Sequence, residues 1–190
     1  MRMKSIFLLT IATVLSVSIV MAEEPAGDPM AGMPSGAPPE MKQLEFLVGE
    51  WDVASNMKMM PTDTAWVASK GMCTYNYILE GCVMQMDYHD KIMGMDFHGM
   101  GFHSYNRFTN KWQVVWADNM TGLLNIYQGV KENGKTVVEG VETMMGMTYD
   151  SRMTTYNETP TSFDWKAESS MDGGKTWMEM MNAHYTKRAK

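Results

Sequence analysis

The chain is 190 residues long and has 22 acidic and 16 basic residues, which gives a formal net charge of −6 at pH 7. This acidic balance argues against nucleic acid as a partner, because binding to a phosphate backbone depends on clustered Lys and Arg. The sequence also has no serine elbow, His-x-x-x-His zinc pair, phosphate loop or Cys-His dyad in a recognisable context, so a non-enzymatic role is favoured.

The first 22 residues have the pattern of a secretory signal peptide. Arg2 and Lys4 precede an uncharged apolar run from Ile6 to Val20, which is shorter than the roughly 20 residues needed to span a bilayer. Cleavage is expected after the small residue Ala22, and no cysteine follows that would carry a lipid anchor. We therefore expect a periplasmic or secreted mature protein that does not insert into membranes.

Residues 23–39 are rich in Pro, Gly and Ala. Such a composition cannot bury enough apolar surface to offset the entropy of ordering the chain, so it predicts a flexible linker. The remaining residues, 40–190, have the usual size of one domain with a single core. Apolar residues at helical spacing follow Pro39 and predict one short helix that ends before Gly49: Met41, Leu44, Leu47 and Val48.

Beyond Gly49 the apolar pattern changes to a period of two, and stretches rich in Val, Thr, Tyr, Trp and Met predict strands. Turn residues separate these stretches at 60–62, 80–81, 91–94, 109–111, 119–122, 133–134, 145–146, 157–161 and 172–174. Asn133-Gly134 is the strongest hairpin signal among them. The connections are too short for parallel crossovers, so about ten antiparallel strands are expected, and closure into a barrel would remove exposed edges.

Several motifs resemble a secreted bacterial family known as domain of unknown function 1579, over roughly residues 41–188. They are Gly49-Glu50-Trp51, Phe97–Asn106, Trp112, Trp116-Ala117-Asp118 and Tyr185–Arg188. Ser104 and Asn106 depart from the family pattern, which has glycine and aspartate there, so this chain lacks the carboxylate at position 106. The resemblance implies a calycin (lipocalin-like) barrel preceded by one short helix, and it implies no reaction.

Gly49 and Trp51 lie where the helix gives way to the first strand. By analogy with lipocalins, Trp51 is interpreted as a plug that closes one end of the barrel, with a basic side chain stacked on its indole ring. Arg188 and Lys187, in the last strand, are the candidates for that stacking partner.

The leading functional hypothesis is a barrel that binds a small apolar or amphipathic ligand in a cavity lined by Met and aromatic side chains. Each lining candidate is equally well explained by core packing. The candidates are Trp66, Tyr75, Tyr77, Met84, Met86, Phe97, Tyr105, Trp116 and Tyr127. A purely structural interaction module, with a filled interior and an exposed apolar patch, is a further alternative.

The chain contains 24 methionines. Thioether sulfur together with imidazole suits Cu(I), so a soft-metal binding or stress protein is the rival hypothesis. Its candidate ligands are Met93, Met95, His98, Met100 and His103. Strand parity weighs against a compact site, because His98 and Met100 would share one face of a strand and His103 would lie on the other.

Two remaining predictions concern histidine and cysteine. Haem is a second cofactor alternative, through His184 in a strand near the C-terminus, whereas His89 is interpreted as a solvated surface residue. Cys73 and Cys82 would lie too far apart along the hairpin that turns at residues 80–81 to form a disulfide, so free thiols are expected.

Overall fold

The computed structural model describes residues 32–60, 62–144 and 146–189. The predicted signal peptide and part of the predicted linker lie outside these ranges. The chain divides into residues 1–34 and a compact unit from Ser35 to Lys190. Among the described residues there is no helix that combines the length and apolar character needed to cross a membrane.

The compact unit begins with η1, a 3₁₀ helix over Pro39–Leu47. Its buried side chains, Met41, Leu44 and Leu47, are spaced by three, as the three residues per turn of a 3₁₀ helix require. The predicted helix is therefore present in this tighter form, and Val48, expected on its apolar face, is exposed because the helix has already ended. Pro38, which the sequence placed in the linker, is buried.

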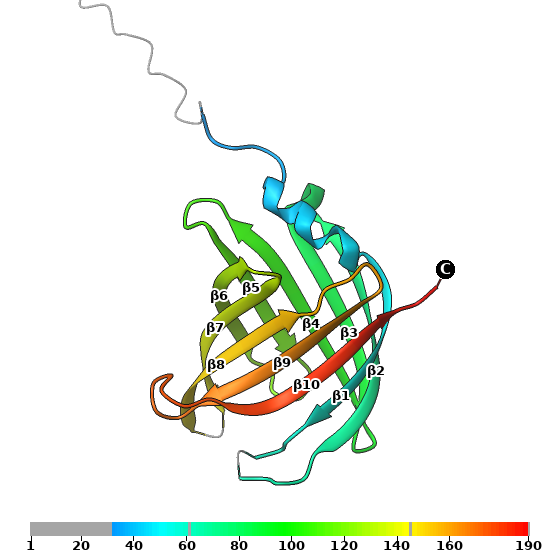
Figure 1. Cartoon of the computed structure of the whole chain (residues 1–190), viewed down its shortest axis with the longest axis vertical. Helices are drawn as coiled ribbons and strands as arrows, with labels where there is room; N and C mark the ends of the chain where they lie inside the picture. The colour runs from blue at the N-terminus through cyan, green and yellow to red at the C-terminus, as the bar shows by residue number, and fades with distance from the viewer. Residues whose placement is uncertain (1–31, 61, 145, 190) are drawn as a thin grey trace, which may run out of the picture. The chain divides into compact units, whose positions relative to one another are not determined.

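Ten antiparallel strands form a closed barrel in which each strand pairs with its sequence neighbours and β1 pairs with β10 (Figure 1). This confirms the predicted fold. The strands are β1 (Gly49–Met57), β2 (Val67–Ile78), β3 (Val83–Ile92), β4 (Met95–Asn106), β5 (Lys111–Asp118), β6 (Leu124–Glu132), β7 (Lys135–Met144), β8 (Met147–Tyr156), β9 (Ser162–Ser170) and β10 (Met178–Lys187). A single short 3₁₀ turn, η2 (Leu79–Gly81), joins β2 to β3.

Each predicted turn coincides with a connection between strands among the described residues, although Lys91, Ile92 and Lys111 belong to the adjoining strand ends. Asn133 and Gly134 have φ values of +52° and +72°, and Met93 and Gly94 have +51° and +83°. Two consecutive positive φ values are required by the tight two-residue turns that match the twist of an antiparallel hairpin. These turns set the register of their hairpins, so that Ile92 lies opposite Met95 and pairing continues outward from there.

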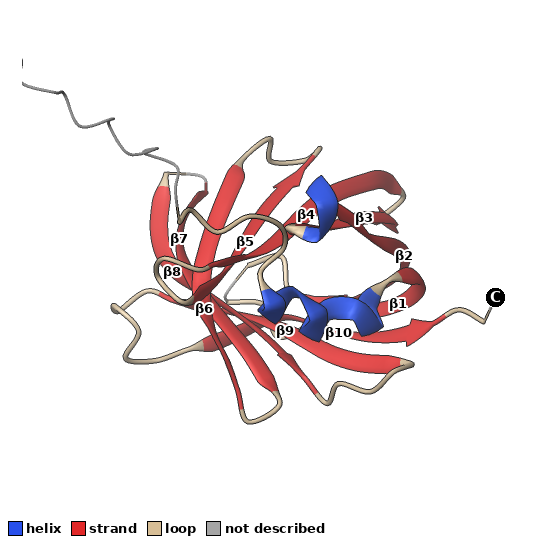
Figure 2. Ribbon diagram, turned by 90° about the horizontal axis from the view of Figure 1, so that it is seen from above, coloured by secondary structure: helices blue, strands red, loops and turns tan. Residues whose placement is uncertain are grey.

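The two ends of the barrel differ. The helix η1 lies across one end, as Figure 2 shows in the view from above. Because the strands alternate in direction, the loops after β1, β3, β5, β7 and β9 all lie at the other end. No helix of the described residues covers that end, which is called the open end below, and the half of the interior next to it the open half.

Trp51 links η1 to the barrel at the closed end. Its side chain is fully buried, and its indole N–H donates a 2.6 Å hydrogen bond to the Leu47 carbonyl. The Lys187 ammonium lies 5.3 Å from the centre of the Trp51 ring and donates to the Phe46 carbonyl at 2.6 Å. Gly49 has a φ of +124°, and a Cβ there would lie 3.3 Å from the Lys187 side chain, so glycine suits the position.

Of the two candidates for the stacking partner, the structure therefore places Lys187 over Trp51. Arg188 is turned to the outside, where its guanidinium lies 2.6 Å from the Asp52 carboxylate. The reason is strand parity: Lys187 shares the inward face of β10 with Tyr185, and the next residue must point the other way.

Candidate functional site

Eight of the nine predicted cavity residues belong to the hydrophobic cluster inside the barrel, as buried members or packed against it: Tyr75, Tyr77, Met84, Met86, Phe97, Tyr105, Trp116 and Tyr127. Trp66 is the exception. It precedes β2 in an open-end loop, is 40% exposed, and has the Lys58 ammonium 4.9 Å from its ring centre. The period-two pattern assigns a side chain to the inner or outer face only within a strand, and Trp66 lies just before β2.

An aromatic wall lines the open half. The Trp116 ring lies flat over Gly99, so close that a Cβ at Gly99 would come within 2.2 Å of it. Phe97 is stacked beside Trp116, with ring centres 6.3 Å apart and an interplanar angle of 21°. The absence of a side chain at Gly99 is therefore what allows the indole to lie along the barrel wall rather than project across the interior.

The same arrangement recurs twice. A Cβ at Gly140 would lie 2.8 Å from the Tyr127 ring, and a Cβ at Gly71 would lie 2.7 Å from the Tyr88 hydroxyl. Tyr88 was not among the predicted cavity residues, although its position two residues beyond Met86 in β3 gives it the same inward face. Three aromatic rings thus lie against glycines on the inner wall.

Substitution of Gly99 by alanine tests this arrangement. We expect Gly99→Ala to lower the free energy of unfolding by about 1–3 kcal/mol, because the indole of Trp116 has to leave its place. Denaturant titration measures the loss, and near-ultraviolet circular dichroism reports the ring displacement. The control is Gly101→Ala on the same face of β4, where the nearest atom, Met86 Cβ, lies 3.3 Å away. Equal losses in both variants would contradict the expectation.

Carboxylates face the interior in the open half. Asp90 accepts hydrogen bonds from the Tyr88 hydroxyl at 2.7 Å and from the Ser69 hydroxyl at 2.6 Å. Desolvation, assisted by the hydrogen bond to Asp90, raises the pKa of Tyr88. The tyrosine therefore remains a neutral donor to the carboxylate at any ordinary pH.

Glu142 occupies a similar position across the barrel. It accepts from the Tyr127 hydroxyl at 2.7 Å and from the Tyr149 hydroxyl at 3.0 Å. Desolvation and the neighbouring Glu142 charge raise the pKa of Tyr149 to about 12. Asp118 is the third inward carboxylate, and it accepts from the Trp116 indole N–H at 3.0 Å.

The described basic residues of the open half do not balance these charges from inside. Lys70 and Lys91 are exposed and occupy outward positions of β2 and β3, Lys175 is exposed in the loop after β9, and Lys58 stacks on Trp66. The inner wall of the open half therefore combines apolar rings with an excess of negative charge.

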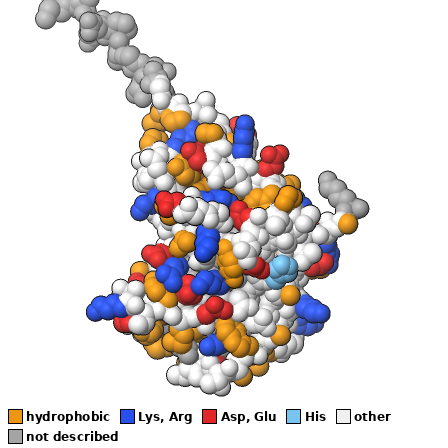
Figure 3. Space-filling view, viewed as in Figure 1, with side chains coloured by type: hydrophobic (Ala, Val, Ile, Leu, Met, Phe, Trp, Pro, Cys, Tyr) orange, Lys and Arg blue, Asp and Glu red, His pale blue; other side chains and the backbone are white. Residues whose placement is uncertain are grey.

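Methionine surrounds the open end. Every loop there carries at least one exposed methionine, either within the loop or at the adjoining strand end, and these residues are called the methionine rim: Met59, Met60, Met93, Met95, Met120, Met144, Met147, Met171 and Met178. Figure 3 shows hydrophobic side chains gathered along the lower edge of the barrel, where these loops lie. At the closed end the exposed large apolar residues are Val48, Leu79 and Phe108.

The predicted copper ligands do not converge. Met93 and Met95 belong to the methionine rim, His98 and Met100 are on the outer face of β4, and His103 faces inward on the same strand. Burial lowers the pKa of His103 to about 4, which keeps its imidazole neutral, and its ring lies 6.2 Å from that of Tyr75.

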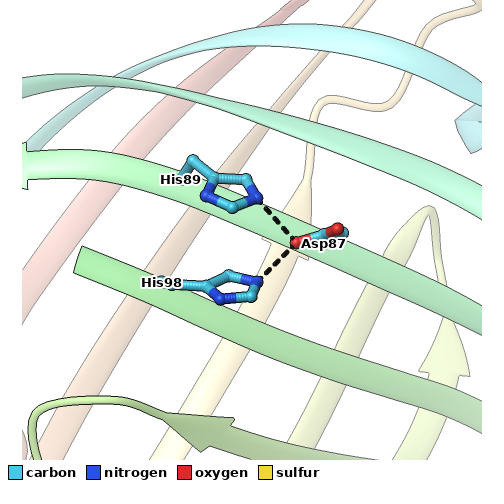
Figure 4. A group of neighbouring side chains, drawn as sticks. All are labelled: Asp87, His89 and His98. Carbon is cyan, nitrogen blue, oxygen red and sulfur yellow. Dashed lines mark hydrogen bonds and ion pairs between the residues drawn. The ribbon is translucent and has the colours of Figure 1, made fainter. Parts of the chain in front are cut away.

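His98 instead meets two residues that the sequence analysis did not group with it. Its Nε2 lies 2.8 Å from Asp87 Oδ1, and His89 Nε2 lies 3.0 Å from the same oxygen (Figure 4). The turn at Met93-Gly94 was the available signal, because it places His89 directly opposite His98. Extending the strand pairing outward from that turn predicts that His89 and His98 lie side by side.

His184, the predicted haem ligand, lies on the outer surface. Its side chain is 56% exposed, and its Nδ1 lies 2.7 Å from Asp164 Oδ1. Its neighbours on either side in β10, Ala183 and Tyr185, are the residues that face inward. A haem inside the barrel would therefore not be reached by this imidazole. Cys73, which is buried, and Cys82 are both free thiols.

Two of the hollows between described residues are not lined by the aromatic wall. One, of about 280 Å³, adjoins η1 and η2 and is lined by Ala37, Pro38, Pro39, Met41, Lys42, Glu45, Tyr77 and Gly81. The other, of about 360 Å³, lies along β1 and β2 and is lined by Ala54, Ser55, Asn56, Ala68, Ser69 and Lys70.

Comparison with known proteins supports the fold. The family profile described as protein of unknown function (DUF1579) matches residues 37–187, and no curated protein matches the chain significantly. The crystal structure of Rv2717c from M. tuberculosis has a TM-score of 0.58 and 11% identity, over 80% of this chain and 99% of that chain. The S-type phycobiliprotein lyase CPES from Guillardia theta has a TM-score of 0.55 and 9% identity, over 78% and 92%. At such identities the likeness concerns the fold alone.

Proposed function

The chain belongs to the DUF1579 family of proteins of unknown function, and from the geometry of its barrel we propose that it binds a small amphipathic molecule through the open end. The observation that carries the proposal is the methionine rim, which surrounds the entrance to an interior lined by Trp116, Phe97 and Tyr127. Methionine is flexible and polarizable, and it suits surfaces that must adapt to an apolar partner.

The distribution of methionine favours this proposal over copper binding. A Cu(I) site needs thioethers that converge on one point. Here they are spread over five loops around a barrel mouth. An exposed apolar surface of this kind on a soluble domain typically marks a binding region.

The polar end of the ligand is expected to carry positive charge. Asp90, Asp118 and Glu142 face the open half of the interior, and the described lysines of that half lie outside it. A buried or half-buried carboxylate is stabilised by a cationic partner, whereas a ligand carboxylate or phosphate would be repelled.

The expected compartment follows from the amino-terminal sequence. We propose that the protein acts in the periplasm or outside the cell, on the basis of the signal peptide pattern in residues 1–22. Amphipathic molecules crossing an aqueous compartment need a protein that covers their apolar surface, which is consistent with a barrel of this kind.

Two matched dyes test the proposal. N-phenyl-1-naphthylamine is neutral, and 8-anilinonaphthalene-1-sulfonate has the same ring system with an added negative charge. We expect saturable fluorescence enhancement with the neutral dye and weaker binding of the anionic one at low salt, with the difference reduced as salt screens the carboxylates. A third titration with dansylcadaverine, which is cationic, should give the tightest binding.

Variants at the two ends locate the site. The double variant Met93→Gln with Met95→Gln should weaken binding of the neutral dye by roughly threefold to tenfold, or about 0.7–1.4 kcal/mol. Phe108→Gln removes a side chain that is 79% exposed at the closed end and should leave binding unchanged. Absence of saturable binding, or equal losses in both variants, would refute the proposal.

A further inference from the structure

A cluster of three metal-ligating side chains lies on the outer face of the barrel, away from the interior just described. Asp87 and His89 are two residues apart on β3 and so share one face of the sheet, and His98 is the direct cross-strand partner of His89 on β4. The inward side chains of the same strands include Met86, Tyr88 and Phe97. The cluster is called the outer triad below.

The side chains of the outer triad converge. The imidazole rings of His89 and His98 are stacked at 4.2 Å with an interplanar angle of 11°. Both present Nε2 to Asp87 Oδ1, at 3.0 Å and 2.8 Å (Figure 4). The three possible ligand atoms all lie within 4.8 Å of one another. Each side chain is between 42% and 58% exposed, so the cluster is open to ions from solution.

We propose that the outer triad binds a divalent transition-metal ion through His89 Nε2, His98 Nε2 and an Asp87 carboxylate oxygen. Ligand atoms held 2.0–2.2 Å from a tetrahedral ion lie roughly 3.4 Å from one another. The present separations of 2.8 Å and 3.0 Å differ from that value by only a few tenths of an ångström. Side-chain movements that separate the ligand atoms slightly would let an ion enter between them.

The donor set determines the class of ion. Two imidazoles and a carboxylate suit Zn²⁺, Cu²⁺, Ni²⁺ or Fe²⁺, and they suit Ca²⁺ and Mg²⁺ poorly because those ions take oxygen ligands almost exclusively. Affinity within the series should follow the usual order, with Cu²⁺ the tightest. Three protein ligands leave at least one coordination position for water.

Methionine flanks the outer triad on both sides. Met72 is the cross-strand partner of His89 on β2, and Met100 is the partner of Asp87 on β4. Both occupy the outward face, and Met72 is 46% exposed. If either methionine supplied a fourth ligand, its thioether would favour copper over zinc, because sulfur is a softer donor than nitrogen or oxygen.

The scaffold holds the ligands rigidly. Strands β3 and β4 pair continuously from Ile92 opposite Met95 to Val83 opposite Ser104. Sites built on paired strands keep their geometry better than sites on loops. The hairpin therefore brings the three ligands together before any ion arrives, and little chain entropy is lost on binding.

Isothermal titration of the tag-free chain with Zn²⁺, and separately with Cu²⁺, tests the inference. We expect one ion per chain. His89→Gln and His98→Gln should each weaken binding by more than about tenfold, because loss of a direct ligand exceeds the 10- to 100-fold effect of an outer-sphere partner. Asp87→Asn should act in the same direction. With Cu²⁺, electron paramagnetic resonance should show two coupled nitrogens in the parent and one in His98→Gln.

A matched control is present on the same surface. His184 and Asp164 form a His–carboxylate pair at 2.7 Å, with an imidazole 56% exposed, but no second histidine joins them. His184→Gln should therefore change the metal affinity by less than about twofold. All substituted side chains are solvent-accessible, and thermal unfolding checks that each variant is folded. Lack of binding by the parent, or equal losses from His184→Gln and His98→Gln, would overturn the proposal. The result does not depend on the dye experiments, since the outer triad lies on the outer face of β3 and β4, whereas the proposed dye site lies inside the barrel.

Discussion

The chain with Trp51→Ala is expected to lose about 3–5 kcal/mol of its free energy of unfolding. Trp51 is fully buried and packs edge-on against Phe163, with ring centres 5.0 Å apart. Its indole N–H holds the last turn of η1 through the Leu47 carbonyl, and Lys187 lies over its ring. Truncation would open a large cavity, leave the Leu47 carbonyl without this donor and release the helix from the barrel end.

Urea denaturation followed by far-ultraviolet circular dichroism measures this loss. Trp66→Ala is the matched control, because the same residue type is removed at a site that is 40% exposed and contacted by Lys58. Trp66→Ala should lower the free energy of unfolding by less than about 1 kcal/mol. If the two variants lost the same free energy, Trp51 would not act as the plug of the closed end.

Acidification from about pH 6.5 to pH 4 is expected to remove roughly 2–3 kcal/mol of stability through His103 alone. Burial lowers the pKa of this imidazole from 6.5 to about 4. Between these values the unfolded chain binds a proton at His103 that the folded chain does not bind, so the free energy of unfolding falls as the pH falls. The contribution is present above about pH 6.5 and is lost progressively as the pH falls through about 4. The lower part of the range allows for the partial accessibility of the residue.

His103→Gln isolates the effect. Other groups also titrate in this window, so the quantity to compare is the slope of the unfolding free energy against pH in the parent and in the variant. We expect the variant to be flatter by up to one proton between pH 4 and 6.5, whatever its absolute stability. Identical slopes would show that the imidazole is solvated and does not contribute.

The barrel itself was predictable because its signals are local. Turn residues such as Asn133-Gly134 need positive φ, and alternation along a strand assigns side chains to faces without any knowledge of the neighbouring strand. Parity placed Tyr75, Met84 and Trp116 inside in this way. It could not place Trp66, which lies outside a strand, and it could not decide whether a methionine at a strand end joins the core or the surface.

The outer triad and the methionine rim were not predicted, for different reasons. The outer triad depends on the exact register of one hairpin, and His89 was interpreted as a surface residue while His98 was a candidate copper ligand. The methionine rim depends on barrel topology, because loops far apart in sequence meet only when alternate connections fall at one end. Neither arrangement leaves a repeated spacing in the sequence.

Sequence by itself determined that about ten antiparallel strands follow one leading helix, and it identified inward residues on β1 to β6, since turn chemistry and side-chain periodicity act over a few residues. The tertiary structure decided which residues meet across strands: Lys187 rather than Arg188 over Trp51, the carboxylates of Asp90 and Glu142 within the open half, and Asp87 between two histidines. These pairings depend on the strand register and on closure of the barrel. Both result from many weak contacts along the entire barrel, so no local sequence pattern predicts them.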